Sequence, residues 1–167
     1  MRLVHAVGTV LIVGTVALGA AELLQARSEL PSRVASHFGA DGHADGWMSR
    51  DAFVSVSIGV LAFLGALFLG LAYGIPLLPI SLINIPHREY WLATERRRAT
   101  LDAVTKMLLA MGVVTTALLC GVFKLTIDAN LETEPRLDGT EWSLLAGFAV
   151  VFVAILGATL WRFRKPA

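Results

Sequence analysis

Hydrophobic residues along the chain gather in four long runs, without the alternation that is typical of strands. The runs cover about residues 3–24, 52–73, 101–123 and 142–161. A helix needs about 20 mostly apolar residues to cross a bilayer, and each run meets that length. A strand would be shorter and would alternate polar with apolar positions. The pattern predicts an all-α integral membrane four-helix bundle, formed as a single four-span domain over residues 1–167.

The first run has a second interpretation, because it lies at the N-terminus. Arg2 gives it a positive start, and Gly19, Ala20 and Ala21 resemble a signal-peptide cleavage site. Its apolar stretch is longer than the hydrophobic region of a typical signal peptide. We therefore expect a retained spanning helix, with a cleaved secretory signal as the alternative.

Basic residues between and beyond the runs are unevenly distributed. The N-terminus, the link between the second and third runs and the C-terminal tail are basic, whereas the first and third links are mixed or acidic. Short cytoplasmic loops of membrane proteins carry an excess of Lys and Arg. We therefore expect a multi-pass protein of the cell membrane with both termini in the cytoplasm. The basic residues that predict this orientation are Arg2, Arg88, Arg96, Arg97, Arg98, Lys106, Arg162, Arg164 and Lys165.

Composition narrows the possible function classes. Hydrophobic residues make up 56% of the chain and charged residues 16%, which is typical of membrane proteins rather than soluble domains. The net charge of +1 gives no basic field for nucleic acid. The middles of the runs hold Thr15, Thr115 and Thr116 but no ionisable residue, which disfavours an ion-coupled carrier. The single cysteine, Cys120, excludes a disulfide within the chain.

Small residues recur at spacings of four or eight in two of the runs. Such spacing puts them on one helix face, and small residues let helices approach closely in lipid. We expect these faces to contact other helices inside the bundle, or a second copy of the chain in a homo-oligomer. The residues are Ala62, Ala66, Gly70 and Gly74 in the second run, and Ala146, Ala154 and Ala158 in the fourth.

The first link, expected outside the cell, is rich in glycine and polar residues. It is predicted as a Gly-rich outer loop, one arrangement of which is a lid over the outer end of the bundle. His37, Asp41, His43 and Asp45 are ligand types that zinc and copper accept, so one interpretation is a divalent metal site. Their spacing matches no established zinc signature. The alternative is a capped turn in which Asp and His bond the local backbone.

The second link combines aromatic and basic residues in a basic inner loop. Pro86 prevents simple continuation of a helix, and Asn84 suits a cap or a turn. Tyr90 and Trp91 beside arginines predict an anchor at the inner membrane surface. Exposed loops carry function more often than spans do, so a partner-binding surface is the alternative.

Together the two links resemble a bacterial membrane-protein family, the domain of unknown function sixteen forty-eight. This domain forms the N-terminal part of Sdp-type immunity proteins, which protect cells against a secreted toxin. The resemblance implies a protein of the bacterial inner membrane. The outer-loop motif that carries it is Leu30, Pro31, His37, Phe38, Gly42, Asp45, Gly46, Trp47 and Arg50. The inner-loop motif is Asn84, Pro86, Tyr90 and Trp91.

Three functions fit the sequence. The leading hypothesis is a non-enzymatic membrane protein that binds a peptide or protein at its outer loop, with an immunity or envelope-signalling role. The second is a membrane metalloprotein or enzyme that uses the four outer His and Asp residues, although the chain has no H-E-x-x-H, G-x-S-x-G or P-loop motif. The third is a transporter subunit or assembly factor whose small-residue faces contact other proteins.

Overall fold

Four long helices dominate the computed structural model, which describes residues 2–164. Each is long and apolar enough to cross a membrane, so the predicted all-α, four-span fold class is confirmed. Lys165 lies outside the described residues, as does the side chain of Arg2. The long helices are α1 (Arg2–Ala26), α2 (Arg50–Gly74), α4 (Thr94–Leu131) and α5 (Thr140–Arg162). The short elements are β1 (Arg33–Phe38), β2 (Ala44–Ser49), η1 (Ile75–Leu77), η2 (Ile80–Leu82) and α3 (Arg88–Trp91).

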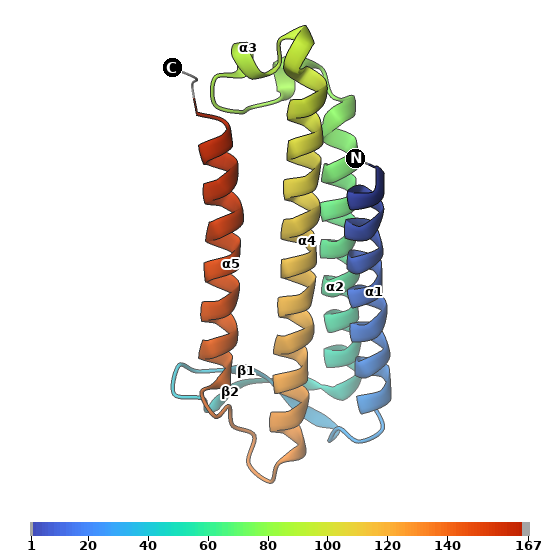
Figure 1. Cartoon of the computed structure of the whole chain (residues 1–167). Coiled ribbons are helices and arrows are strands. Elements are labelled where there is room, and N and C mark those ends of the chain that lie inside the picture. Colours follow the sequence, from blue (N-terminus) through green and yellow to red (C-terminus); the bar gives the residue numbers. More distant parts are fainter. Residues whose placement is uncertain (1, 165–167) are drawn as a thin grey trace.

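The long helices run side by side, with α4 between its neighbours (Figure 1). Both ends of the described chain lie on the same side of the bundle as α3, which we call the basic end. Strands β1 and β2 and the α4–α5 link lie at the opposite side, which we call the hairpin end. Among the described elements, α5 packs only against α4. Because no residue of α5 is fully buried by the protein, lipid must cover most of its surface.

The helix ends follow local chemistry. The hydroxyl of Ser49 accepts a hydrogen bond from the backbone N–H of Ala52, 3.2 Å away, and so caps α2. At its other end α2 stops at Gly74 and the short helix η1 follows, because Pro76 and Pro79 have no backbone N–H to donate to a continuing α-helix. Helix α4 begins at Thr94, well before the apolar run at residue 101.

Helix α4 is longer than its apolar run because charged residues continue it beyond the membrane. It has 38 residues, which correspond to about 57 Å at 1.5 Å per residue. The hydrocarbon core of a bilayer is about 30 Å thick. Glu and Arg are good helix formers, so the arginine-rich stretch remains helical outside lipid. The sequence prediction, which read this stretch as part of a loop, was wrong on that point.

The small-residue stripes do not form the helix contacts inside the bundle. Ala62, Ala66 and Gly70 are exposed on α2, and the three stripe alanines of α5 are exposed as well. The buried glycine of α2 is Gly65, where an added Cβ would lie 2.8 Å from a methyl carbon of Val16. The packing face of α2 is therefore rotated away from the stripe, and the prediction of bundle contacts through it was wrong. A homo-oligomer through these faces stays a prediction.

Threonine hydroxyls join α1 to α4 in the middle of the bundle. Thr116 is fully buried, and its Oγ1 lies 2.7 Å from Oγ1 of Thr15. Each hydroxyl also lies within hydrogen-bond distance of a backbone carbonyl of its own helix. Because a hydroxyl has one proton, one threonine donates to its own helix and the other donates to that threonine. The half-buried Cys120 donates from Sγ to the carbonyl of Thr15 at 3.3 Å. These polar contacts lie where lipid offers no alternative partner.

Candidate functional site at the hairpin end

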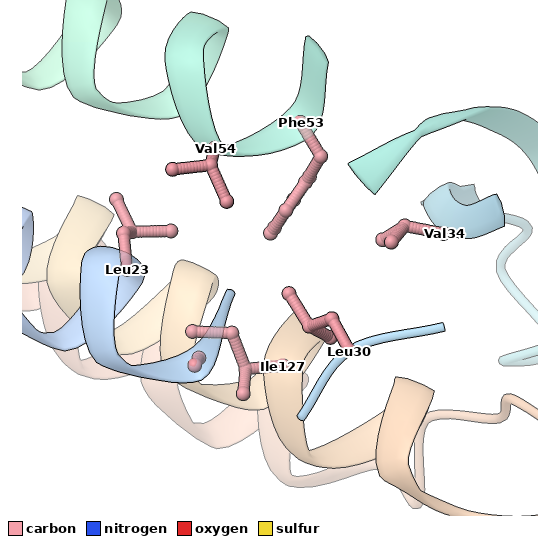
Figure 2. Close-up of a cluster of buried hydrophobic side chains, with 7 residues drawn as sticks. Leu23, Leu30, Val34, Phe53, Val54 and Ile127 are labelled. Atoms are coloured by element: carbon pink, nitrogen blue, oxygen red, sulfur yellow. The ribbon is translucent and has the colours of Figure 1, made fainter. Parts of the chain in front are cut away.

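A cluster of buried apolar side chains fastens the first link to the helix ends (Figure 2). Leu30 precedes β1 and Val34 belongs to it, and both pack against Phe53 at the start of α2. Burying such side chains stabilises the fold by about 1.5–3 kcal/mol each. The link therefore lies firmly against the bundle. The complete cluster is Leu23, Ala26, Leu30, Val34, Phe53, Val54 and Ile127.

The predicted Gly-rich loop is in fact a β-hairpin. Strand β1 pairs with β2 in antiparallel register, so that Ala35 lies opposite Trp47 and His37 opposite Gly46. The register shifts on either side of His37, which indicates a bulge there. A tight turn at residues 39–43 joins the strands, with the N–H of Gly39 donating to the carbonyl of His43 at 2.8 Å.

Asn130 of α4 joins the hairpin to the bundle through its amide group. Its Oδ1 accepts from the backbone N–H of Ala35 at 2.7 Å, and its Nδ2 donates to the carbonyl of Ala35 at 2.8 Å. Nδ2 also donates to the carbonyl of Thr126, one turn back on α4. The side chain therefore replaces a missing neighbouring strand, and both Asn130 and Ala35 are buried. Sequence analysis missed this residue because a polar side chain at a helix end is ordinarily solvated.

Two glycines of the outer-loop motif occupy positions where a side chain does not fit. Gly42 has a φ of 79°, a left-handed conformation that L residues rarely adopt. A Cβ at Gly42 would also overlap the carbonyl oxygen of Leu137, whose N–H donates to the Gly42 carbonyl at 3.0 Å. A Cβ at Gly46 would lie 2.7 Å from the Cβ of His37. Gly42 lets the hairpin turn contact the α4–α5 link, and Gly46 lets β2 lie close to His37 of β1.

The polar residues of the motif bind one another and the local backbone. Nδ1 of His37 pairs with Oδ1 of Asp45 across the strands. Oδ1 of Asp41 accepts from the backbone N–H of His43 at 3.1 Å, the geometry of an Asx turn. Within residues 2–164, no group of three or more His, Cys, Asp or Glu side chains is arranged to hold a metal ion. The capped-turn interpretation fits this geometry better than the metal site does.

The remaining motif residues lie at the two ends of the strands and on β2. Arg50 donates from Nη1 to the carbonyl of Leu30 at 3.1 Å. The guanidinium of Arg33 lies 5.3 Å from the ring centroid of the half-exposed Trp47, a cation–π contact. Pro31 is exposed where the chain enters β1, and Phe38 is half-buried at the end of that strand.

Two adjoining hollows lie between the hairpin turn, α5 and the α4–α5 link. The larger has a volume of about 840 Å³ and is mainly acidic; its charged lining residues are Asp41, Glu132, Glu134, Arg136, Asp138 and Glu141. The smaller has a volume of about 400 Å³ and includes Phe38, Val122 and Leu145 in an apolar wall. Glu141 and Trp142 line both hollows, so an acidic surface continues into an apolar one.

Asp138 keeps its negative charge at the rim of the larger hollow. The side chain and the backbone N–H of Thr140 both bond to its carboxylate, and together they lower the pKa of Asp138 below the ordinary value. The backbone bond from Thr140 N–H is 2.9 Å long. Hydrogen bonds to the charged form of a carboxylate favour ionisation. The hollow therefore presents a charged carboxylate at the first turn of α5.

At the basic end, the inner-loop motif holds the end of α5. Nε1 of Trp91 donates to the carbonyl of Phe163 at 3.1 Å, and the two rings meet edge to face at 5.6 Å. Tyr90 lies beside Trp91 and beneath the guanidinium of Arg96, 3.9 Å from its ring centroid. Through these contacts the inner-loop motif fixes the end of α5 and also presents polar side chains at the surface.

Asn84 and Pro86 lie in the turn that precedes Tyr90 and Trp91. Both line an apolar cavity of about 240 Å³ between η2, α4 and the end of α5. Asn84 is exposed, and Pro86 precedes His87, which has a φ of 51° in the left-handed region. The turn is thus shaped by Pro86 and by a strained neighbour rather than by glycine.

Residues 10–63 match the family model described as Domain of unknown function (DUF1648). The match is about a third of the chain, and it confirms the predicted resemblance over that segment. No curated protein and no solved structure matches the chain.

The DUF1648 segment runs from α1 through the hairpin into α2. It includes the whole outer-loop motif, whereas the inner-loop motif lies beyond it. Asn130 and Leu137, which hold the hairpin, also lie outside the segment. The hairpin of the DUF1648 segment therefore depends on residues from the second half of the chain.

Sequence analysis also missed a polar cluster at the basic end. Nε2 of His5 on α1 lies 3.0 Å from Oδ1 of Asp102 on α4, and Oδ2 of Asp102 lies 2.7 Å from Nζ of Lys106. In the sequence these residues are charges near the ends of two apolar runs, separated by almost a hundred positions. Only the packing of α1 against α4 brings them together.

Proposed function

We propose that this membrane protein is non-enzymatic and binds a cationic, amphipathic peptide at the hairpin end. One observation carries the proposal: an acidic hollow of about 840 Å³ continues into an apolar one of about 400 Å³. Five carboxylates surround the larger hollow, against the single guanidinium of Arg136. A peptide with one basic and one apolar face matches both surfaces in charge and polarity.

A fixed platform supports binding of this kind. The hairpin is held by the buried amide of Asn130, and its turn is held by the contact between Gly42 and Leu137. Binding to a preorganised surface loses less conformational entropy than binding to a loop that must first become ordered. Trp142, more than half exposed at the junction of the two hollows, offers a flat apolar contact.

It follows from this proposal that the protein protects the cell against a peptide that acts on the cell envelope, or signals that such a peptide is present. The test compares survival of a sensitive bacterial strain, with and without the chain, under challenge by a synthetic lysine–leucine amphipathic peptide. We expect expression to raise survival, and the double variant Glu132→Gln, Glu134→Gln to remove most of that gain. Equal survival with and without the chain would contradict the protective role.

Direct binding separates the site from its biological role. A fluorescently labelled lysine–leucine peptide is titrated against the chain in nanodiscs of neutral phosphatidylcholine, with a glutamate–leucine peptide as the acidic counterpart. The matched control is Glu29→Gln, Asp128→Asn, which removes the same charge at the same end but lies outside both hollows. We expect the hollow variant to weaken binding about tenfold and the control to change it by less than about twofold. Equal loss in both variants would argue against a site in the hollows.

We infer further that both ends of the chain face the cytoplasm and that residues 1–167 act as one four-span domain. The clustering of arginines at the basic end supports this orientation. The bundle then presents its hairpin outside the inner membrane, where an envelope peptide can reach it. Reporter tags inserted after Met48 and after Glu95 should face opposite compartments. Tags in the same compartment would contradict the orientation.

A further inference from the structure

A second hollow, at the basic end, has the features of an anion site. It has a volume of about 430 Å³ and lies between the first turns of α1, the short helix η1 and the first turns of α4. Its polar lining comes from His5, Thr94, Arg97, Arg98, Asp102 and Thr105, and its apolar lining from Pro76 and Leu101. It lies at the opposite end from the peptide hollows and does not depend on the function proposed for them.

The charges in this hollow leave two guanidinium groups available. Asp102, the only carboxylate of the lining, is engaged by Nζ of Lys106 at 2.7 Å and lies 3.0 Å from the imidazole of His5. Arg97 and Arg98 form no ion pair with any residue of the described chain, 2–164. Guanidinium groups bind phosphate oxygens with two parallel hydrogen bonds.

Two buried polar atoms in the wall also point to a ligand. Nε2 of His5 and Oδ1 of Asp102 are each inaccessible to solvent, and neither has a well-oriented hydrogen bond within residues 2–164, although they lie 3.0 Å apart. Buried polar groups without partners are rare in folded proteins. A ring N–H of His5 can donate to a phosphate oxygen, and Asp102 can accept from a hydroxyl of the same ligand.

The first turn of α4 adds donors to the same hollow. Thr94 is the first residue of this 38-residue helix, and no side chain caps the helix start. The backbone N–H groups of Arg96 and Arg97 bond to the carbonyl of Ala93, which leaves those of Thr94 and Glu95 without helical partners. Such a helix start favours anions, and here it adjoins the two guanidinium groups.

The position of the hollow matches the depth of lipid headgroups. The apolar run of α4 begins at Leu101, in the wall of the hollow, and that of α1 begins at Leu3, two residues before His5. Thr94, Arg97 and Arg98 lie on the polar side of Leu101, whereas His5 and Asp102 lie within the first residues of the apolar runs, so the hollow extends across the membrane–water interface. We propose that this hollow binds an anionic phosphate group, carried by a phospholipid such as phosphatidylglycerol or free in solution.

Native mass spectrometry of the purified full chain in detergent tests the lipid source. The probes are phosphatidylglycerol and the net-neutral phosphatidylcholine, and the test variant is Arg97→Gln, Arg98→Gln. The control is Arg162→Gln, Arg164→Gln, which removes two charges at the same end outside the hollow. We expect the test variant to bind phosphatidylglycerol about tenfold more weakly, and the control to change binding by less than about twofold.

Calorimetric titration with inorganic phosphate tests the other source on the same proteins. If the test variant loses phosphate binding and the control keeps it, the site binds free phosphate. If the test variant loses phosphatidylglycerol binding and the control keeps it, the site binds lipid. Equal loss in both variants, or no loss in either for both probes, would overturn the proposal. The single variant Arg98→Gln, at an exposed position, guards against misfolding, since it should retain helix content and still weaken binding.

Discussion

Replacing Asn130 with alanine should release the hairpin from the bundle. The change removes both bonds to Ala35 and leaves a buried N–H and a buried carbonyl without partners. An unsatisfied buried polar group costs about 1–3 kcal/mol. Two such groups would cost about 3 kcal/mol in total, because water that enters the site replaces part of the lost hydrogen bonding. That is a factor of about 100 in the local opening equilibrium.

Hydrogen–deuterium exchange on the peptide that covers residues 33–49 measures this opening directly. We expect its protected amides to exchange about 100-fold faster in Asn130→Ala, while amides in the middle of α2 keep their protection. Asn84→Ala, at an exposed position of the basic end, is the matched control and should leave the hairpin unchanged. Unchanged hairpin exchange in Asn130→Ala would refute the anchoring role of this amide.

Three further changes test the two ends of the bundle. Gly42→Ala should destabilise the hairpin by about 2 kcal/mol, measured by chemical denaturation, because the left-handed φ and the carbonyl of Leu137 both oppose a Cβ. The amide resonance of Thr140 should report the ionisation of Asp138. Because the pKa of Asp138 is lowered, the hydrogen bonds from Thr140 to its carboxylate are kept at the ordinary carboxylate pKa and are lost only as the pH falls through the lower, folded-state value. Asp138→Asn should abolish this titration. Trp91→Phe should cost about 1 kcal/mol by losing the bond to the end of α5, without loss of helix content.

The spans could be predicted from sequence because lipid imposes one simple condition on them. A spanning helix must satisfy its own backbone and present apolar side chains over about 20 residues, and both requirements are visible in composition. The choice of packing face is not visible in the same way. Gly65 rather than Gly70 meets α1, and nothing in the spacing of small residues distinguishes the two. Which face is buried depends on the neighbouring helices.

The residues of the outer-loop motif were identified from the sequence, but neither their hairpin nor the hollows beside it could be predicted. The residues of the outer-loop motif lie together at one end of the bundle, because they all belong to the link between the first two spans. The hairpin was missed because backbone pairing leaves little trace in two strands of six residues, one of which contains glycine. The hollows were missed because their carboxylates come from both the hairpin turn and the α4–α5 link. Distant segments meet only after the long helices have aligned.

The outer-loop motif and the inner-loop motif both help to hold helix α5 in position. Because it packs only against α4 among the described elements, its position depends on how its two ends are held. The contact of Gly42 with Leu137 holds the chain just before α5, and Trp91 holds the carbonyl of Phe163 just after it. If one of these two contacts is lost, the other still holds α5, whereas loss of both leaves only the packing of α5 against α4.

The double variant Gly42→Ala, Trp91→Phe should therefore loosen α5 more than the two single changes together. Spin labels at the exposed Ala117 on α4 and Ala149 on α5, with Cys120 replaced by serine, report the distance between these helices. We expect each single variant to broaden the distance distribution slightly and the double variant to broaden it by more than their sum. If the broadening is merely additive, the ends of α5 act independently. The contact with α4 alone would then be sufficient to position the helix.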